Sequence, residues 1–265
     1  MARLLVFCES PADFETVQGL VDRVLQERGP DWVRELLEGP SEAAQGFRDW
    51  VPDGEGRKYF DLHKLSAYAS RHKLRVPQGH FAGQPGEAGA LMARTAFLVA
   101  RELALTGTEL DAVLLVWDMD DQSRDRRMGL AQSSNEARPL VPFAIVLGSP
   151  DPMREAWVLA GFEPETDDER ARLAAMRQEL GFNPCEEAHR LDAKKEHAKR
   201  SPKRVLEALT SGEHAREVRC WTKTSLVLLR ARGRHSGLTA FLDEAAESLV
   251  PRLSGIPPRS PLSQD

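Results

Sequence analysis

The sequence is poor in cysteine, in tyrosine and in long apolar runs. Its three cysteines, Cys8, Cys185 and Cys220, are widely separated and form no C-x-x-C pair or other spacing typical of zinc ligands. An odd number of distant cysteines argues against a disulfide framework. We therefore expect free thiols, with Cys8 buried in a first strand.

No apolar stretch approaches the roughly 20 residues that a membrane-spanning helix needs. The N-terminal segment MARLLVFCESPAD reaches acidic residues too early for a signal peptide. We therefore expect a cytoplasmic protein with no membrane partner.

Positive charge is also in deficit. The chain of 265 residues has a formal net charge of -5, which excludes a globally basic nucleic-acid coat but permits local basic patches. Its 41% hydrophobic and 29% charged residues are typical of a globular protein. The length suits one large α/β domain, alone or with a small appendage.

Three short apolar, β-prone runs alternate with amphipathic helical segments. The first helix begins at the N-cap Ser10, has Pro11 in its first turn, and ends at Gly29. This alternation predicts an α/β fold with a mostly parallel sheet flanked by helices. The expected strands are 3–9, 111–118 and 139–148, and the expected helices are 10–29, 87–107 and 123–137.

Two regions interrupt or extend this pattern. Glycine, proline and charge punctuate residues 31–86, which we interpret as a partly irregular insertion with one or two short elements. The chain becomes mainly helical after Pro152, with helices expected near 152–161, 167–180, 201–210, 215–231 and 237–252. We expect an α/β core in residues 1–150, completion of that core and a helical part in 151–253, and a loose tail in 254–265.

Carboxylates follow two of the predicted strands. Glu9 ends the first strand, and Asp118 and Asp120 follow the apolar run DAVLLVW. The carboxyl ends of parallel strands meet at one edge of a sheet, so these groups are expected to converge. Such like charges are unfavourable unless a proton is shared or a cation neutralises them, and Mg²⁺ or Mn²⁺ prefers oxygen ligands. The alternative is an ordinary solvated turn or helix cap.

A strand followed by Glu, here VFCES, and a later strand followed by Asp-x-Asp, here LVWDMDD, resembles the Toprim domain. Topoisomerases, bacterial primases and the overcoming-lysogenization-defect (OLD) nucleases share this domain. The resemblance covers residues 3–9 and 110–205. It implies a Toprim-like, Rossmann-like sheet with Glu9, Asp118 and Asp120 around a divalent metal ion.

The OLD-type branch implies further site residues. Asp13 lies four positions after Glu9, and Glu155 lies in DPMREAWVLAGF, which resembles a segment of small stand-alone Toprim proteins from phage-defence loci. Both would serve a second metal ion. Lys203 is the candidate for the basic residue that offsets charge on the phosphate. Lys194, Lys195 and Lys199 compete with it for this role.

The sequence also departs from the family pattern. Met153 stands where a second-metal ligand is expected, and Ser149 or Asp151 would have to replace it. The stretch between Glu9 and Asp118 is longer than in a minimal Toprim core. No G-x-x-x-x-G-K-[ST] motif is present, so we do not expect the fused ATPase of the larger OLD enzymes.

The resemblance implies phosphodiester hydrolysis by a metal-activated water, which needs no side-chain nucleophile. A topoisomerase is disfavoured because both tyrosines, Tyr59 and Tyr68, fall in the irregular segment. We expect a nuclease or nicking enzyme acting on DNA, with a homodimer and a separately encoded ATPase as expected partners. The alternatives are a non-catalytic regulatory subunit that docks an ATPase, and a phosphoacceptor protein of the response-regulator kind.

Residues 190–204 form the densest cationic run, and several arginines follow in residues 216–234. Basic side chains of this kind bind phosphates without reading sequence. Solvated helix faces are an equally good explanation. The predicted nucleic-acid contacts are Lys194, Lys195, Lys199, Arg200 and Arg204.

Overall fold

The computed structural model describes residues 1–39, 41–77, 89–193, 195 and 197–255. Its centre is a parallel sheet in which strand β1 (Ala2–Cys8) pairs with β2 (Arg48–Trp50), β3 (Phe60–Asp61) and β4 (Ala112–Val116). β4 in turn pairs with β5 (Ala144–Gly148), and the strand order is β2-β1-β4-β5 with β3 beside β1. The expected α/β class and the parallel sheet are confirmed.

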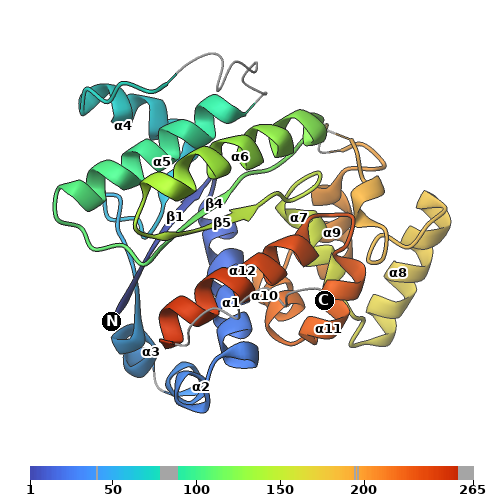
Figure 1. Cartoon of the computed structure of the whole chain (residues 1–265). Coiled ribbons are helices and arrows are strands. Elements are labelled where there is room, and N and C mark those ends of the chain that lie inside the picture. Colours follow the sequence, from blue (N-terminus) through green and yellow to red (C-terminus); the bar gives the residue numbers. More distant parts are fainter. Residues whose placement is uncertain (40, 78–88, 194, 196, 256–265) are drawn as a thin grey trace, which may run out of the picture.

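Helices cover both faces of the sheet (Figure 1). Helices α5 (Ala90–Leu105) and α6 (Ser123–Ala137) lie on one face, and α1 (Pro11–Arg28) and α12 (Leu238–Ser254) lie on the other. Side chains of β1 alternate between two cores, with Leu5 and Phe7 in the first and Leu4, Val6 and Cys8 in the second. Both faces are apolar, which explains why the strand has no polar alternation.

Local sequence explains where α1 begins and ends. The Ser10 hydroxyl accepts a hydrogen bond of 3.2 Å from the backbone N–H of Asp13, and Pro11 occupies the first helical position. The N–H of Gly29 bonds the carbonyl of Leu25 at 2.8 Å and closes the last turn. The helices predicted at 10–29, 87–107 and 123–137 and the strands at 3–9, 111–118 and 139–148 are all present within the described residues.

The prediction for residues 31–86 was wrong about the amount of regular secondary structure, which is larger than expected. In place of one or two short elements, the described part holds two strands of the main sheet and several helices. The strands β2 and β3 span only three and two residues, too short for a periodic pattern to reveal them. Residues 78–86 lie outside the described residues. The helices are α2 (Asp31–Glu38), α3 (Ser41–Phe47), the 3₁₀ turn η1 (Leu62–Lys64) and α4 (Leu65–Arg71).

The chain after β5 is helical, as expected, but the helix predicted at 215–231 is two helices. The Ser225 hydroxyl caps the second by accepting the N–H of Leu228, and the buried Thr224 hydroxyl donates to the Gly161 carbonyl at 2.5 Å. These hydrogen bonds fix the chain at Thr224 and Ser225, where the first helix ends and the second begins. The elements are η2 (Arg138–Leu140), before β5, and then α7 (Arg154–Ala160), α8 (Asp167–Leu180), η3 (Ala188–Arg190), α9 (Pro202–Thr210), α10 (His214–Thr222), α11 (Leu226–Arg232) and α12.

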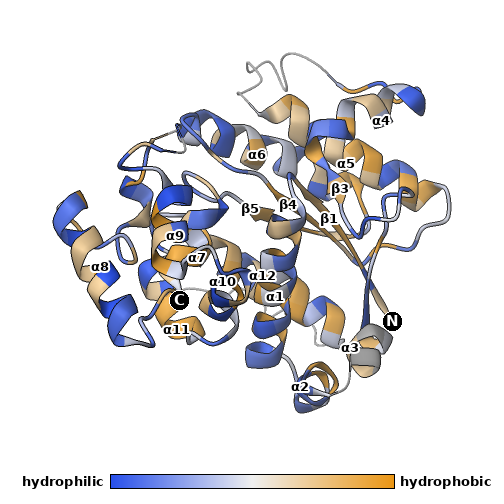
Figure 2. Cartoon of the chain, turned by 180° about the vertical axis from the view of Figure 1, so that it is seen from behind, coloured by the Kyte–Doolittle hydropathy of each residue, from blue (hydrophilic) through white to orange (hydrophobic). Residues whose placement is uncertain are grey.

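The apolar strands lie between helices whose outer faces are more polar (Figure 2). One continuous core cluster runs from β1 to α12 and includes Trp157 and Trp221, both almost fully buried. Cys8, Cys185 and Cys220 are free, as expected, and all three are buried, whereas burial was predicted only for Cys8. The boundary near residue 150 stays a prediction, and residues 256–265 of the expected tail lie outside the described residues.

Candidate functional site

Asp118 lies at the centre of a group of carboxylates at the carboxyl edge of the sheet. It follows β4 by two residues, and Glu9 directly follows the neighbouring β1. Burial raises the pKa of Asp118 well above its ordinary value, and the negative charges of Asp13, Glu9 and Glu155 raise it further. The structure therefore brings these four predicted residues together. We call Glu9, Asp13, Asp118 and Glu155 the carboxylate cluster.

Asp13 is held in the cluster by the start of α1. Its backbone N–H bonds the Ser10 hydroxyl, and its Oδ2 accepts the backbone N–H of Glu9 at 3.2 Å. This is close to a capping box, in which the side chain of the third helical residue reaches back to the preceding backbone. Asp13 is only 8% exposed, and burial is the main reason that its pKa is raised. The helix cap thus accounts for the hydrogen bond to Oδ2 of Asp13. It does not account for the burial of Asp13 beside other carboxylates.

Glu9 faces the neighbouring elements of the edge. Its Oε1 accepts a hydrogen bond of 3.2 Å from Trp117 Nε1 and lies 3.8 Å from Nε2 of His63. Burial raises the pKa of Glu9, while the nearby His63 lowers it. His63 was not predicted for the site. It belongs to η1, which follows β3, and the pairing of Asp61 with Cys8 brings it beside Glu9.

Asp120 lies at the side of the cluster rather than in it. Its backbone is left-handed, with φ of 50°, and its Oδ2 pairs with Arg126 Nη1 at 2.8 Å. Arg126 also donates to the carbonyl of Asp118 and lies over the Trp117 ring, 4.5 Å from its centre. Asp120 still acts electrostatically on Glu9 and helps to raise its pKa. The structure therefore separates the two aspartates that were expected to share one ion: Asp118 lies among the other carboxylates, and Asp120 is paired with Arg126.

A cation that the sequence did not reveal lies among the carboxylates. Arg154 is 8% exposed, and its guanidinium lies 3.8 Å from Asp13, 3.6 Å from Glu155 and 3.3 Å from Glu217. Its backbone N–H donates to Oδ1 of Asp118 at 3.0 Å. One arginine cannot neutralise the four carboxylates, so the cluster remains rich in negative charge.

Lys203, the predicted basic residue, lies elsewhere. It is exposed in the first turn of α9 and is not among the main groups that shift the pKa of Glu9, Asp13 or Asp118. Arg154, and not Lys203, is the basic side chain that lies among these carboxylates. Its identity could have been suspected only from its place directly before Glu155, at the start of a helix.

Asp151, one of the two predicted substitutes for a second-metal ligand, is otherwise engaged. Met153 precedes α7 as its N-cap residue without a side-chain bond. Asp151 accepts hydrogen bonds from Ser123 at 2.7 Å and from Arg127 at 2.8 Å. These contacts hold the Asp151 carboxylate away from the role of a metal ligand that was considered for it.

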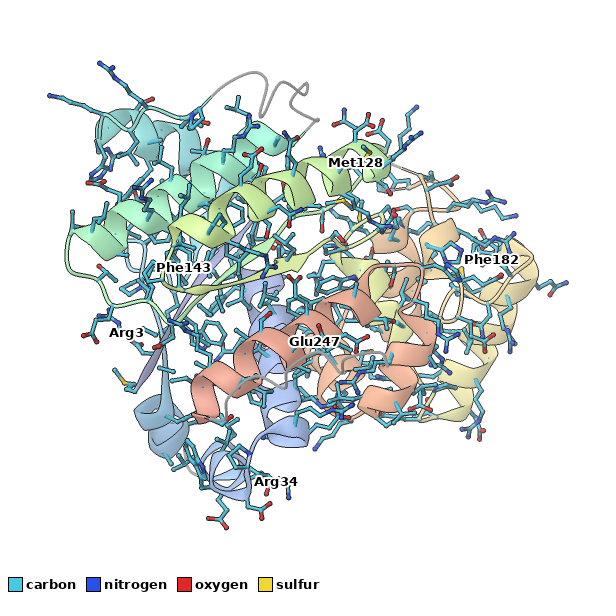
Figure 3. All side chains as sticks on the ribbon, in the orientation of Figure 1. Arg3, Arg34, Met128, Phe143, Phe182 and Glu247 are labelled. Carbon is cyan, nitrogen blue, oxygen red and sulfur yellow. The ribbon has the colours of Figure 1, made fainter. Side chains whose placement is uncertain are left out.

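The cationic run lies on the C-terminal helical side of the molecule. Lys195, Lys199 and Arg200 are exposed, whereas Lys194 lies outside the described residues. Arg204 pairs with Glu179 and bonds the Ala198 carbonyl, so it supports the loop before α9. Phe182, labelled in Figure 3, carries the guanidinium of Arg190 at 4.2 Å and that of Arg200 at 5.9 Å from its ring centre.

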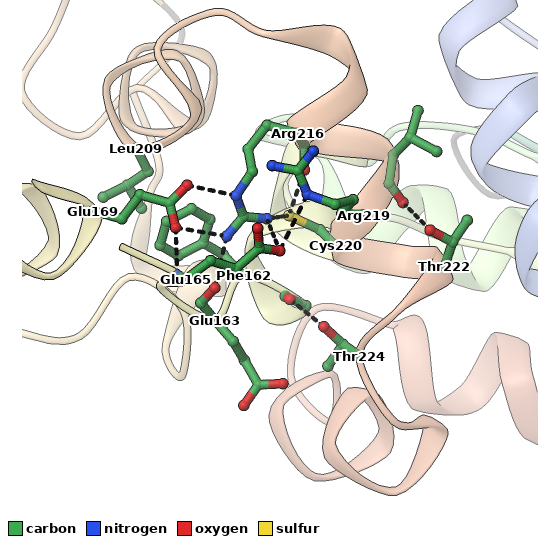
Figure 4. Close-up of polar contacts among 12 residues, drawn as sticks. Phe162, Glu163, Glu165, Glu169, Leu209, Arg216, Arg219, Cys220, Thr222 and Thr224 are labelled. Carbon is green, nitrogen blue, oxygen red and sulfur yellow. Dashed lines mark hydrogen bonds and ion pairs between the residues drawn. The ribbon is translucent and has the colours of Figure 1, made fainter. Parts of the chain in front are cut away.

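Several downstream arginines that were candidates for phosphate binding are used inside the protein. Arg216 is 2% exposed and binds Glu169 at 2.6 Å and the Glu163 carbonyl at 2.6 Å (Figure 4). Arg219 pairs with Glu165 at 3.1 Å in the same network. Arg216 is therefore neither a phosphate contact nor part of a solvated helix face, the two expectations for this region, because its guanidinium is enclosed in the protein. The other internal contacts are those of Arg230 with Glu27 and Asp243, and of Arg232 with the Ala160 and Phe162 carbonyls.

The donor chemistry of the carboxylate cluster fits a hard divalent cation. Its donors are all oxygens, its negative charge exceeds the charge of Arg154, and three of its members have raised pKa values. No three His, Cys, Asp or Glu side chains of the described chain already stand in the arrangement of a metal site. Binding of a divalent cation would therefore require side chains of the carboxylate cluster to move.

Among the helices of residues 1–39, 41–77, 89–193 and 197–255, none is both long and apolar enough to cross a membrane. Comparisons with models of known protein families, with curated proteins and with solved structures found no match to this chain.

Proposed function

We propose that the chain is a Mg²⁺- or Mn²⁺-dependent nuclease of the Toprim type that hydrolyses or nicks DNA. The observation that carries the proposal is the convergence of Glu9 and Asp118 from adjacent parallel strands, together with Asp13 and Glu155. Carboxylates that are partly buried at one sheet edge and only partly neutralised are arranged to attract a cation. The Toprim resemblance of the strand-Glu and Asp-x-Asp segments supports the same chemistry.

Glu9 and Asp118 would hold the principal ion, and Asp13 and Glu155 would approach it from α1 and α7. A bound divalent ion of this kind supplies an activated water and neutralises charge on the phosphate. The chain's own residues provide positioning. The N–H of Arg154 orients Asp118, Trp117 orients Glu9, and the exposed imidazole of His63 can hold or release a proton beside Glu9.

The proposal extends to partners by resemblance alone. The exposed cations Lys195, Lys199 and Arg200 would bind the DNA backbone, and a separately encoded ATPase would regulate cleavage in an anti-phage defence system. A homodimer would let two such sites cut both strands.

The test is cleavage of supercoiled plasmid and of single-stranded DNA in Mg²⁺ or Mn²⁺ by wild type, Asp118→Asn and Asp167→Asn. Asp118→Asn keeps an oxygen for the Arg154 N–H but removes the charge. It should lower the rate about a hundredfold or more, since even groups that merely support a metal ligand are worth about 10–100-fold. Asp167→Asn makes the same change at a side chain that is 96% exposed and should cleave normally. Equal residual cleavage by wild type and Asp118→Asn would refute the nuclease.

A second candidate is a non-catalytic regulatory subunit that docks an ATPase. The pairing of Asp120 with Arg126 and the absence of an oxygen ligand at Met153 favour it. Lack of cleavage in every divalent ion, together with co-purification of an ATPase, would choose this function.

A further inference from the structure

A cavity of about 360 Å³ is lined by residues of β3, η1 and α4, and η1 also carries His63, whose ring lies beside Glu9. It lies between the loop that precedes β3 and the helix α4, and its volume is within the roughly 300–1,000 Å³ of small-ligand sites. Residues from these elements line it. They include Phe60, Asp61, Lys64, Tyr68, Arg71 and His72.

The cavity and the carboxylate cluster share one short element. Asp61 lines the cavity and pairs in register with Cys8, the residue before Glu9. Two residues later, His63 Nε2 lies 3.8 Å from Oε1 of Glu9, while Lys64 again lines the cavity. A molecule bound at the cluster could therefore continue into the cavity over η1.

The cavity offers a stack of aromatic rings. Tyr68 and His72 are stacked, with ring centres 4.2 Å apart and planes at 20°, and Phe60 meets Tyr68 edge-on at 5.4 Å. His72 is exposed, so the stack ends toward solvent. Planar rings that end in solvent are the surfaces on which proteins stack unpaired nucleobases.

Most charged side chains that line the cavity form ion pairs with one another. Arg57 binds Asp53 at 2.6 Å and Glu55 at 2.9 Å, and Lys64 pairs with Glu55 at 3.5 Å. Arg71 makes no ion pair with any carboxylate in the part of the chain that the structure describes. A neutral planar ring suits such a cavity better than a phosphate does, and Arg71 remains available to a phosphate next to the ring.

We propose that this cavity binds a nucleobase of an unpaired nucleotide adjacent to the phosphodiester at the carboxylate cluster. The inference rests on the proposed function and narrows its substrate class to DNA with unpaired bases, such as single strands, flaps or gaps. A base within a duplex is stacked and paired, so it cannot reach Tyr68 and His72 without being extruded.

The test is binding of a short single-stranded oligonucleotide that carries 2-aminopurine, in EDTA so that no cleavage occurs. Adding the protein should lower the fluorescence of the single strand, because 2-aminopurine stacks on the His72 ring. The same addition should lower the fluorescence of a duplex of the same sequence by a smaller fraction. His72→Ala should weaken binding about tenfold, because the variant loses one ring on which a base stacks. Arg71→Ala should weaken binding and lower its salt dependence.

Arg75→Ala is the matched control, because Arg75 is an exposed cation of the same segment that does not line the cavity. It should bind as wild type does. Circular dichroism checks that each variant is folded. Wild-type affinity and quenching in the His72→Ala, Arg71→Ala double variant, or equal quenching by duplex, would overturn the subsite.

The two proposals fail separately. Quenching that depends on His72, without cleavage in any divalent ion, supports the base subsite and refutes the nuclease. Cleavage that depends on Asp118, with binding indifferent to His72 and Arg71, supports the nuclease and refutes the subsite.

Discussion

The backbone N–H of Arg154 donates a hydrogen bond to Oδ1 of Asp118, which joins the first residue of α7 to the loop after β4. The side chain of the same arginine lies beside Asp13 and Glu155. One residue therefore orients the central carboxylate through its main chain and offsets part of the cluster's charge through its side chain. The main-chain bond survives any substitution except proline, so the two contributions can be separated by mutation.

Asp118→Asn should stabilise the metal-free protein at high pH. The raised pKa of Asp118 means that the folded chain binds more protons than the unfolded chain above the ordinary value of 3.8. The free energy of unfolding therefore falls as pH rises from there toward the raised pKa. The variant lacks this loss and should gain about 1 kcal/mol at pH 8 in EDTA, typical of a relieved functional site, and less at pH 4. Urea unfolding measures it, and a less stable variant at pH 8 would contradict it.

A divalent cation should stabilise the wild-type fold. An ion that binds only the folded chain raises the free energy of unfolding by about 2.7 kcal/mol at a concentration a hundred times its Kd. Thermal unfolding in increasing Mg²⁺ or Mn²⁺ should show a rising Tm for wild type and for Asp167→Asn, but a flat one for Asp118→Asn. Parallel curves for all three proteins would show that the ions do not bind the carboxylate cluster.

Arg154→Met should destabilise the protein by about 3 kcal/mol at pH 8, the scale for removing one partner of a buried ion pair. The loss should shrink at pH 5, because the raised pKa values of Asp13 and Asp118 let them take up protons when the guanidinium is gone. Arg124→Met, at an exposed position of α6, is the control and should change little. Equal losses in the two variants would argue against a role of Arg154 in the cluster.

The Arg216–Glu169 pair should matter for stability alone. Both side chains are buried, 2% and 5% exposed, so Glu169→Leu leaves a buried cation and should lose about 3 kcal/mol. Adding Arg216→Met removes that cation, and the double variant should be more stable than Glu169→Leu. Urea titrations of the single and double variants measure the coupling. An additive double variant would mean that the pair is not coupled.

Exposed cations of the loop before α9 should govern nonspecific DNA binding. Removing one cation that binds a phosphate lowers the slope of log affinity against log salt by about 0.7 to 0.9. Replacing Lys195, Lys199 and Arg200 with Ala should therefore flatten the salt dependence in a fluorescence anisotropy titration. Arg216→Met should leave the slope unchanged, since its guanidinium is enclosed. A triple variant with the wild-type slope would mean that these residues are a solvated face only.

The long helices were predictable because the apolar pattern and the capping residues that define them lie within each helix. The helix from Pro11 has its cap, its apolar stripe and its glycine stop within 20 positions, so no distant contact is needed to recognise it. The break at Thr224 was not predictable, because the bond that holds it goes to Gly161, 63 residues away. The strands β2 and β3 were missed because two or three residues contain no period.

The candidate site divides in the same way. The order of residues placed Glu9 and Asp118 behind two apolar strands, and parallel pairing makes such positions neighbours whatever the loops between them do. Nothing local distinguishes Arg154 from an exposed arginine, or His63 from a loop histidine, because their roles depend on packing across long stretches of chain. The cavity beside them arises the same way, from the docking of α4 against β3. The sequence alone determined which carboxylates follow the strands. The tertiary structure alone decided which side chains contact them and where a cavity forms, because both depend on contacts between segments that are far apart in the chain.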